Sequence, residues 1–263
     1  EEPPSEIKNK MEISHADLME AVAEVDDELI EVYLEHGELT AEEFSSGLKE
    51  GVQNGQLIPV FGGSATNNIG VDLLLKAAIK YLPSPDQRVP VKAKRLLDKS
   101  EVICSANSDK PTSSLVFKTI ADPYAGKLTL FRMFSGCIKG DASIYNSTQD
   151  VTERVGQLYM LQGKKQIQVS EISEGDIGAV AKLKSTITGD TLSDLGEKVV
   201  FPPITFPVPV FSRALEPKTR SDEDKISNAL HRLLEEDPTL KMERSSQTGE
   251  LLLSGLGQAH LDV

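Results

Sequence analysis

The feature that most constrains the fold of this sequence is a change in hydrophobic period near Lys94. From there to Phe201, short stretches of alternating or β-branched residues are separated by glycines. Such a series of short strands indicates a closed antiparallel β-barrel, which we place over residues 86–201. The expected strands lie at 115–120, 127–134, 143–145, 155–161, 166–172 and 179–183.

Residues 1–57 have a helical pattern instead. Apolar residues recur at steps of three and four after Ser14, which resembles a capping start, and acids fill the opposite face. A second helix is predicted to open with Thr40 and Glu43 and to end before Gly55. We therefore expect two helices that form a hairpin. The apolar positions of the first are Leu18, Val22, Val25, Leu29 and Tyr33.

Residues 58–85 combine a strand, a turn and a helix. The segment 57–61 is predicted to be a short buried strand, 62–66 a glycine turn and 70–82 a helix. This is half of a parallel α/β unit, which needs neighbouring strands to cover it. Pro83 and Pro85 end the helix, and a proline-punctuated linker is expected from there to about Lys94.

Residues 202–263 show a third pattern, in β-α-β-β order. The strands are expected at 208–213, 239–243 and 250–254, and the helix at 221–236. This order suits the opening of a ferredoxin-like α+β sandwich that is truncated before its second helix is complete. Because the chain also begins with Glu1 rather than Met, we expect it to be a fragment of a longer protein.

The net charge of −13 arises from one end of the chain. Residues 1–57 hold 16 acidic residues against three lysines, whereas the remainder carries 25 residues of each sign. An acidic module repels phosphates and can steer a basic partner toward itself; the alternative is that the acids only keep the helices solvated.

The two cysteines, Cys104 and Cys137, exclude a disulfide framework or a thiolate zinc site and favour a reducing, cytosolic compartment. No apolar run is long enough to span a membrane, and the N-terminus lacks the pattern of a secretory signal.

Motifs for independent catalysis are missing from the sequence. There is no GxxxxGK[ST] phosphate loop and no Asp-x-x-Gly, so the chain cannot by itself cradle and cleave a nucleoside triphosphate. Neither metal-ligand spacing among the histidines nor a Gly-x-Ser-x-Gly elbow is present, so no metal site and no nucleophilic catalysis is predicted. The four histidines are His15, His36, His231 and His260.

One constellation nevertheless suits ligand binding. Gly63, Ser64 and Ala65 follow the predicted strand and would offer backbone N–H groups at the carboxyl edge of an α/β sheet, where such folds bind ligands. The alternative is an ordinary glycine turn between a strand and a helix.

Several groups of residues follow one another along nearly the whole chain. The first group consists of Glu24–Tyr33, Glu38–Glu43, Ile58–Ala65 and Tyr81–Pro85. The second consists of Phe117–Lys118, Asp122–Thr129, Tyr145–Ser147, Glu174–Ile177 and Thr188–Thr191. The third consists of Glu216–Lys218, Glu235–Pro238, Gly255–Gly257 and His260–Asp262. In order and spacing the chain resembles translation elongation factor G, the second group being similar to the second domain of that family and the third group to its third domain.

The resemblance implies a parent protein that is a cytoplasmic, ribosome-dependent GTPase and moves tRNA and messenger RNA during translation. This chain would keep the last strand and helix of a P-loop GTPase domain, part of its helical insertion (1–57), the second domain (86–201) and a truncated third domain (202–263). The phosphate-binding and Mg²⁺-binding elements would lie before Glu1. The fragment itself is therefore not expected to bind GTP or GDP tightly, or to hydrolyse GTP.

Two sets of site residues follow from the resemblance. Gly63, Ser64 and Ala65 fall at the guanine-contacting element of the family, with the Ala65 N–H as the expected donor to the base carbonyl. The acidic helices match the part of the insertion that the family presents to the basic stalk protein of the ribosome. The acids expected to contact the stalk share roughly one helical face or its border, and they are Glu24, Asp27, Glu28 and Glu31.

Ribosomal RNA is the other partner that the resemblance implies, whereas no membrane and no sequence-specific DNA partner is expected. Two alternatives stay open: a stand-alone acidic module that binds the ribosome or another protein without nucleotide chemistry, and a ribosome-protection type of translational GTPase. A third hypothesis, that the chain is an enzyme in its own right, has no support from the spacing of its residues. In place of the family's Gly-Glu-Leu-His-Leu the chain has Gly257–Leu261 with Gln258 and Ala259, which suits a divergent paralogue.

Overall fold

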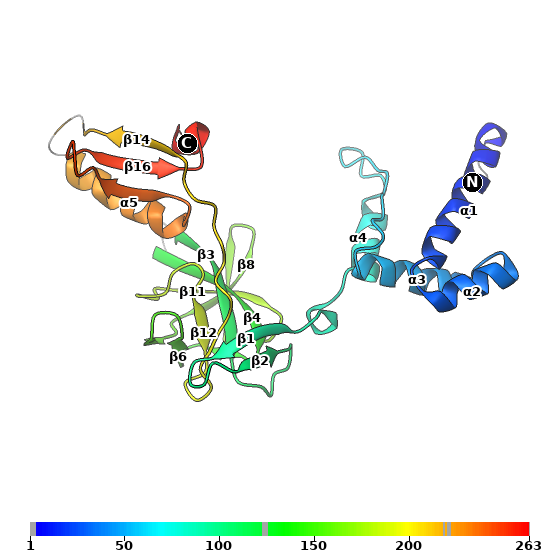
Figure 1. Cartoon of the computed structure of the whole chain (residues 1–263), viewed down its shortest axis with the longest axis horizontal. Coiled ribbons are helices and arrows are strands. Elements are labelled where there is room, and N and C mark those ends of the chain that lie inside the picture. Colours follow the sequence, from blue (N-terminus) through cyan, green and yellow to red (C-terminus); the bar gives the residue numbers. More distant parts are fainter. Residues whose placement is uncertain (1–3, 123–125, 218, 220–221, 263) are drawn as a thin grey trace. The chain divides into compact units, whose positions relative to one another are not determined.

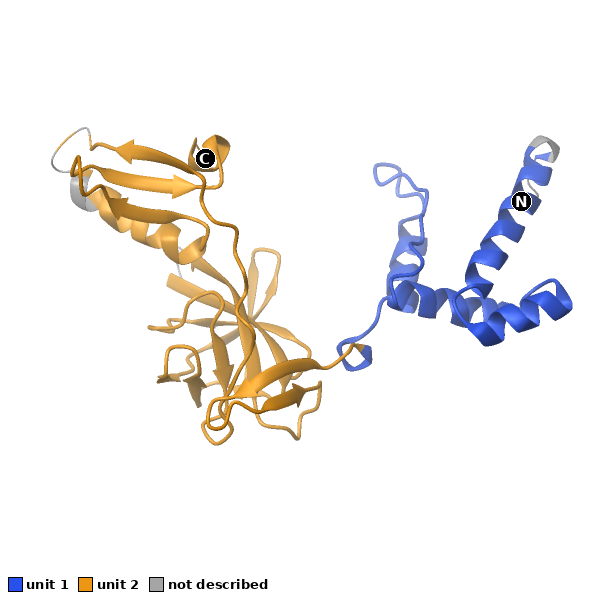
Figure 2. Ribbon diagram, in the orientation of Figure 1, with its two compact units in different colours: residues 1–87 blue, residues 88–263 orange. Residues whose placement is uncertain are grey.

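The computed structural model describes residues 4–122, 126–217, 219 and 222–262. The chain divides into two compact units, residues 1–87 and 88–263 (Figure 2). Three parts of the sequence predictions lie outside the described residues: positions 123–125 of the second-domain motif, Lys218 of the third-domain motif, and Ser221 at the expected start of a helix.

The first unit is helical, with α1 at Ser5–Ala23, α2 at Asp27–His36, α3 at Ala41–Gln53 and α4 at Val71–Tyr81 (Figure 1). The prediction of one helix from Ser14 through Tyr33 is wrong, because α1 ends at Ala23 and α2 begins at Asp27. Asp26 has an extended backbone, and its side chain accepts a hydrogen bond from the Glu28 N–H at 2.8 Å. An aspartate in this conformation is a strong N-cap, so it starts a second helix.

The prediction for α3 is confirmed. The Thr40 hydroxyl oxygen accepts the Glu43 N–H at 3.3 Å, and the Glu43 carboxylate accepts the Thr40 N–H at 2.8 Å, which completes a capping box. Gly47 and Gly51 are buried on this helix because neighbouring elements approach its backbone closely; a Cβ on Gly47 would lie 2.6 Å from Leu29 Cδ1. The shared core consists of Val22, Ala23 and Leu39, packed by Met19, Leu29, Val32, Tyr33, Phe44, Leu48 and Leu57.

The segment that follows differs from its prediction. Residues 57–61 form no strand, and the side chains of Ile58 and Val60 are 86% and 91% exposed. A buried strand is held by ladder hydrogen bonds to neighbouring strands, and no described residue pairs with this segment. On α4 only Ala77 is buried, while apolar side chains of the same helix are more than half exposed: Leu73, Leu74, Leu75 and Ile79.

The second unit begins with an antiparallel β structure. Its main sheet has the order β7-β6-β12-β3-β4-β11-β8-β9. In chain order the strands are β3 (Ser113–Asp122), β4 (Gly126–Ser135), β6 (Ser143–Asn146), β7 (Val151–Arg154), β8 (Leu158–Gln162), β9 (Lys165–Val169), β11 (Ile177–Ala181) and β12 (Thr191–Ser193). A separate antiparallel pair is formed by β5 (Ile138–Lys139) and β10 (Glu171–Ile172).

These strands curl around one core, as a barrel requires. Phe131, Met133, Leu158 and Ile172 are almost completely buried in it and come from strands β4, β8 and β10. The strand expected at 155–161 begins only at Leu158, and the one expected at 166–172 is divided into β9 and β10.

A three-stranded sheet accompanies the barrel, in the order β13-β1-β2. Its strands are β1 (Val91–Arg95), β2 (Glu101–Cys104) and β13 (Val199–Val200). The linker expected up to Lys94 is therefore too long: after the short 3₁₀ helix Pro85–Gln87, the chain enters β1. The reason is that Ala93 is buried in a small cluster with Cys104, Val199 and Phe201.

The last part of the chain has the expected β-α-β-β order. It contains β14 (Phe211–Leu215), α5 (Glu223–Glu236), β15 (Lys241–Arg244), β16 (Leu251–Gly255) and the short helix α6 (Gln258–Asp262). The sheet order is β14-β16-β15, with both pairings antiparallel. Helix α5 packs against β15 and also against β3 of the barrel, where the Glu236 carboxylate accepts the N–H of Ala121 (Figure 1).

Candidate functional site

The predicted guanine-contacting residues lie in a small closed loop before α4. Ser64 and Ile69 exchange two backbone hydrogen bonds of 2.9 Å, and the Asn68 N–H donates to the Ala65 carbonyl at 3.3 Å. The loop can close this tightly because Gly63 has no side chain; a Cβ there would lie 2.7 Å from the Ile69 carbonyl oxygen. Asn68 takes a left-handed backbone with φ of 54°, which asparagine tolerates better than most residues.

The three predicted residues have different roles in this loop. The Ser64 N–H is used within the loop, and its hydroxyl lies 3.3 Å from that of Thr66. In the part of the chain that the structure describes, the Ala65 N–H makes no hydrogen bond. Ala65 is also exposed, so its N–H is available to a ligand. The same holds for the Gly63 N–H, which makes no hydrogen bond to a described residue.

The four predicted stalk-contacting acids lie around the junction of α1 and α2. Glu24 is the C-cap of α1, Asp27 and Glu28 are in the first turn of α2, and Glu31 follows one turn later. The expectation of one shared helical face is therefore wrong, because the Asp26 cap separates Glu24 from the other three. All four side chains are exposed, and none forms an ion pair with another described residue.

The two histidines that lie on the acidic helices, His15 and His36, are exposed. Among the described residues, no group of three or more His, Cys, Asp and Glu residues could hold a metal ion. His260, however, contacts Asp237, with 2.9 Å between its Nε2 and the Asp237 Oδ2. The sequence separation of 23 residues gave no signal for this pair.

Comparisons with known proteins identify the two domains of the second unit. The family model described as Elongation factor G domain 2 matches residues 111–195, and the model described as Elongation Factor G, domain III matches residues 206–263. The chain is also similar to a crystal structure of a protein from Thermus thermophilus, with 34% sequence identity and a TM-score of 0.79. That match covers 100% of this chain and 37% of the other.

A barrel and a β-α-β-β sheet of these two kinds, in this order, define a translational GTPase-like protein. More particularly, the chain belongs to the elongation factor G family, and it spans about 37% of the length of the Thermus chain that it matches. Within the described residues, no helix combines the length and the apolar character needed to cross a bilayer.

Proposed function

We propose that this chain acts as part of a ribosome-dependent GTPase that moves tRNA and messenger RNA during translation, in the cytoplasm. The observation that carries the proposal is the match to both elongation factor G domains, together with 34% identity to the Thermus chain over the full length of this one. Residues 58–85 would be the last strand and helix of the P-loop GTPase domain. Residues 202–263, together with the rest of the third domain in the parent protein, would form a complete ferredoxin-like sandwich.

The exposed apolar side chains around α4 support this role for residues 58–85. Ile58, Val60 and Ile79 are each more than 80% exposed, and apolar surface of this extent is normally covered. A parallel sheet from the rest of the parent protein would pair with 57–61 and cover α4. The segment would then become the buried strand that its sequence predicts.

The loop at Ser64 fits one edge of a guanine base. The Ala65 N–H is exposed and makes no hydrogen bond to a described residue, so it can donate to the base carbonyl. Ser64 cannot contribute its N–H, because the Ile69 carbonyl already accepts it. The remaining parts of the parent protein would bind the phosphates of GTP or GDP together with Mg²⁺, so this chain by itself would neither bind the nucleotide tightly nor hydrolyse it.

The barrel and the third domain would carry the nucleotide-dependent signal to ribosomal RNA, and α5 supports this path. This helix packs against β15 of its own domain and against β3 of the barrel.

The acidic junction of α1 and α2 would dock on the basic stalk protein of the ribosome. Its carboxylates are exposed and free of ion pairs among the described residues, which suits long-range steering.

A titration with a fluorescent guanine nucleotide tests the nucleotide part of the proposal. We expect weak or no binding by this chain, and tight binding by the natural protein that contains it. In that protein, Ala65→Pro removes the N–H and should weaken GTP and GDP binding by about five- to tenfold, as loss of one hydrogen bond predicts. Ala65→Gly keeps the N–H and is the matched control. Equal nucleotide affinity of the natural protein and both of its variants would exclude Ala65 as the base contact.

A further inference from the structure

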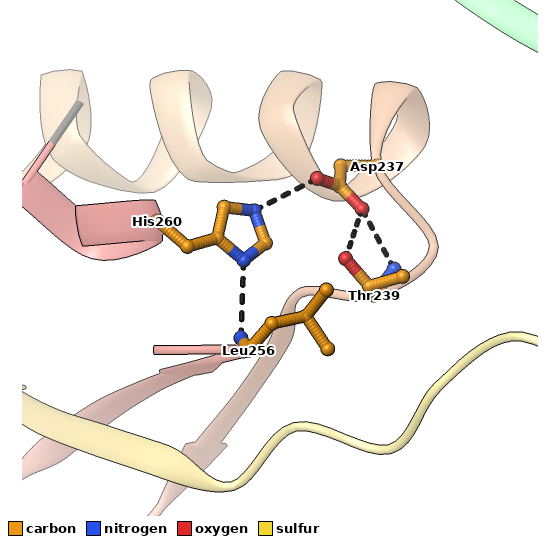
Figure 3. Close-up of polar contacts among 4 residues, drawn as sticks. All are labelled: Asp237, Thr239, Leu256 and His260. Carbon is orange, nitrogen blue, oxygen red and sulfur yellow. Dashed lines mark hydrogen bonds and ion pairs between the residues drawn. The ribbon is translucent and has the colours of Figure 1, made fainter. Parts of the chain in front are cut away.

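His260 joins two different elements of the third domain through its two ring nitrogens (Figure 3). On one side, Nε2 lies 2.9 Å from Oδ2 of Asp237, the residue that ends α5. On the other side, Nδ1 lies 3.1 Å from the backbone N of Leu256, in the turn between β16 and α6. The second oxygen of Asp237 accepts the N–H and the hydroxyl of Thr239, so this carboxylate is fixed in place.

These contacts define the protonation state of the imidazole. A backbone N–H can only donate, so Nδ1 must accept the hydrogen bond from Leu256 through its lone pair and cannot carry a proton. The single proton of the neutral ring is then on Nε2 and is donated to Asp237. A second proton on Nδ1 would point at the Leu256 N–H and eliminate that hydrogen bond. The hydrogen bond to the Asp237 carboxylate would then become an ion pair between the imidazolium and the carboxylate.

The imidazole ring lies close to the backbone of Gly255. A Cβ added to Gly255 would lie 3.0 Å from His260 Nδ1 and 2.7 Å from Leu261 Cδ2, so only glycine leaves space for the ring. The His260 side chain is 25% exposed and that of Asp237 is 38% exposed, so solvent protons reach the pair.

Other charged groups around α6 are paired or point elsewhere. Arg213 on β14 forms an ion pair of 2.9 Å with Asp262 of α6, and Lys241 on β15 pairs with Glu243 at 2.7 Å. Strand β16 has no charged residue. On α5, Glu236 turns to the barrel, and the remaining charged or titratable side chains of its last two turns are exposed: His231, Arg232 and Glu235. Asp237 is thus the charged group that contacts the imidazole among the described residues.

We propose that His260 is a proton-sensitive latch that holds the turn at Gly255–Gly257 and α6 against the end of α5. In its neutral form the ring binds both Asp237 and the Leu256 N–H. On protonation it keeps Asp237 and releases the Leu256 N–H, which loosens the turn and α6. The contact between α5 and the barrel does not depend on this step, because Glu236 holds the Ala121 N–H separately.

Amide hydrogen exchange of the full chain, followed residue by residue by NMR between pH 5 and 8, tests the latch. After correction for intrinsic exchange, we expect the protection of the Leu256 amide to fall by up to about tenfold as the His260 ring signals titrate, as loss of one hydrogen bond predicts. The Ala121 amide is the internal control and should keep its protection. Unchanged Leu256 protection through the His260 titration would overturn the proposal.

Two matched variants separate the two bonds of the ring. In the His260→Asn variant, the side-chain amide oxygen lies near the position of Nδ1 and can accept the Leu256 N–H, so the Leu256 amide should stay protected at every pH. In the His260→Gln variant, the side-chain amide nitrogen lies near the position of Nε2 and no acceptor replaces Nδ1, so the Leu256 amide should be weakly protected at every pH. If either variant fails to fold, Asp237→Asn is decisive: removing the carboxylate should move the pH of Leu256 release downward, because the imidazolium loses its counter-charge. Identical pH dependence in Asp237→Asn and wild type would contradict the latch.

Discussion

Reversing the four acids at the α1–α2 junction tests whether this surface steers a basic partner. Four substitutions to lysine change the net charge of residues 1–57 from −13 to −5. The acids to be replaced are Glu24, Asp27, Glu28 and Glu31. Their exposure means that the change alters the field around the module without creating a buried charge.

The structure also gives the expected cost in stability. Asp27 and Glu28 lie in the first turn of α2, where the interaction of a negative charge with the helix dipole stabilises the helix by roughly 0.3–1 kcal/mol per residue. Glu24 is at the C-terminal end of α1, where a lysine recovers a similar amount. Because each reversal removes a favourable charge and adds an unfavourable one, each effect counts about twice, and the net loss should be about 2 kcal/mol or less. Far-UV circular dichroism and a thermal melt establish that the variant is folded.

Stopped-flow association with a purified basic stalk protein measures the steering effect. At about 0.01 M salt, where the Debye length is roughly 30 Å, we expect the association rate constant to fall by about ten- to a hundredfold. The difference should nearly vanish at about 1 M salt, where the Debye length is about 3 Å, and the dissociation rate should change less than the association rate.

A control variant with the same change in net charge shows whether the position of the acids matters. The same change of eight charge units can be made in the second unit at exposed acids that form no ion pair with described residues: Asp109, Asp176, Glu216 and Glu235. This control should leave most of the association rate intact. Equal slowing by both variants would mean that only net charge matters, and no slowing by either would leave the acids with a role in solubility alone.

Three further predictions concern the stability of the chain. Gly47→Ala should lower the free energy of unfolding of the first unit by about 1–2 kcal/mol in urea titrations, because the added Cβ meets Leu29 Cδ1 at 2.6 Å; Glu50→Ala on the exposed side of α3 should change it by less than about 0.5 kcal/mol. Phe131→Ala should cost the barrel about 3–5 kcal/mol, since the ring is fully buried. Burial raises the pKa of the Asp237 carboxyl, but hydrogen bonds from Thr239 and His260 outweigh it and hold the pKa below its ordinary value. Its contribution to stability should therefore be full above about pH 4 and be lost as pH falls through the lowered pKa. An Asp237→Asn variant with the same acid-unfolding curve as wild type would contradict this.

Local signals in the sequence predict those elements that local interactions determine. Thr40 and Glu43 form their capping box with groups three residues apart, so α3 is predicted correctly. The hydrophobic period continues through Val22, Val25 and Leu29 although the helix does not, because a single Asp26 cap divides it. Periodicity alone therefore overlooks the break between α1 and α2.

Elements that depend on distant partners are less predictable. Residues 57–61 have the composition of a buried strand, yet they are exposed where no described strand pairs with them. Strand β1 falls in the expected linker because its pairing with β13 joins residues far apart in the chain, such as Lys94 and Val200. The contact between His260 and Asp237 likewise depends on how α6 folds back on α5, and no spacing rule contains it.

Ribosome-stimulated GTP hydrolysis by the natural protein that contains this chain is the most direct test of the central proposal. Single-turnover hydrolysis should be compared with and without purified ribosomes, at equal GTP occupancy. We predict that ribosomes accelerate hydrolysis strongly, and that the chain of 263 residues alone hydrolyses no GTP under either condition. A natural protein that binds GTP but hydrolyses it at the same rate with and without ribosomes would contradict the proposed function.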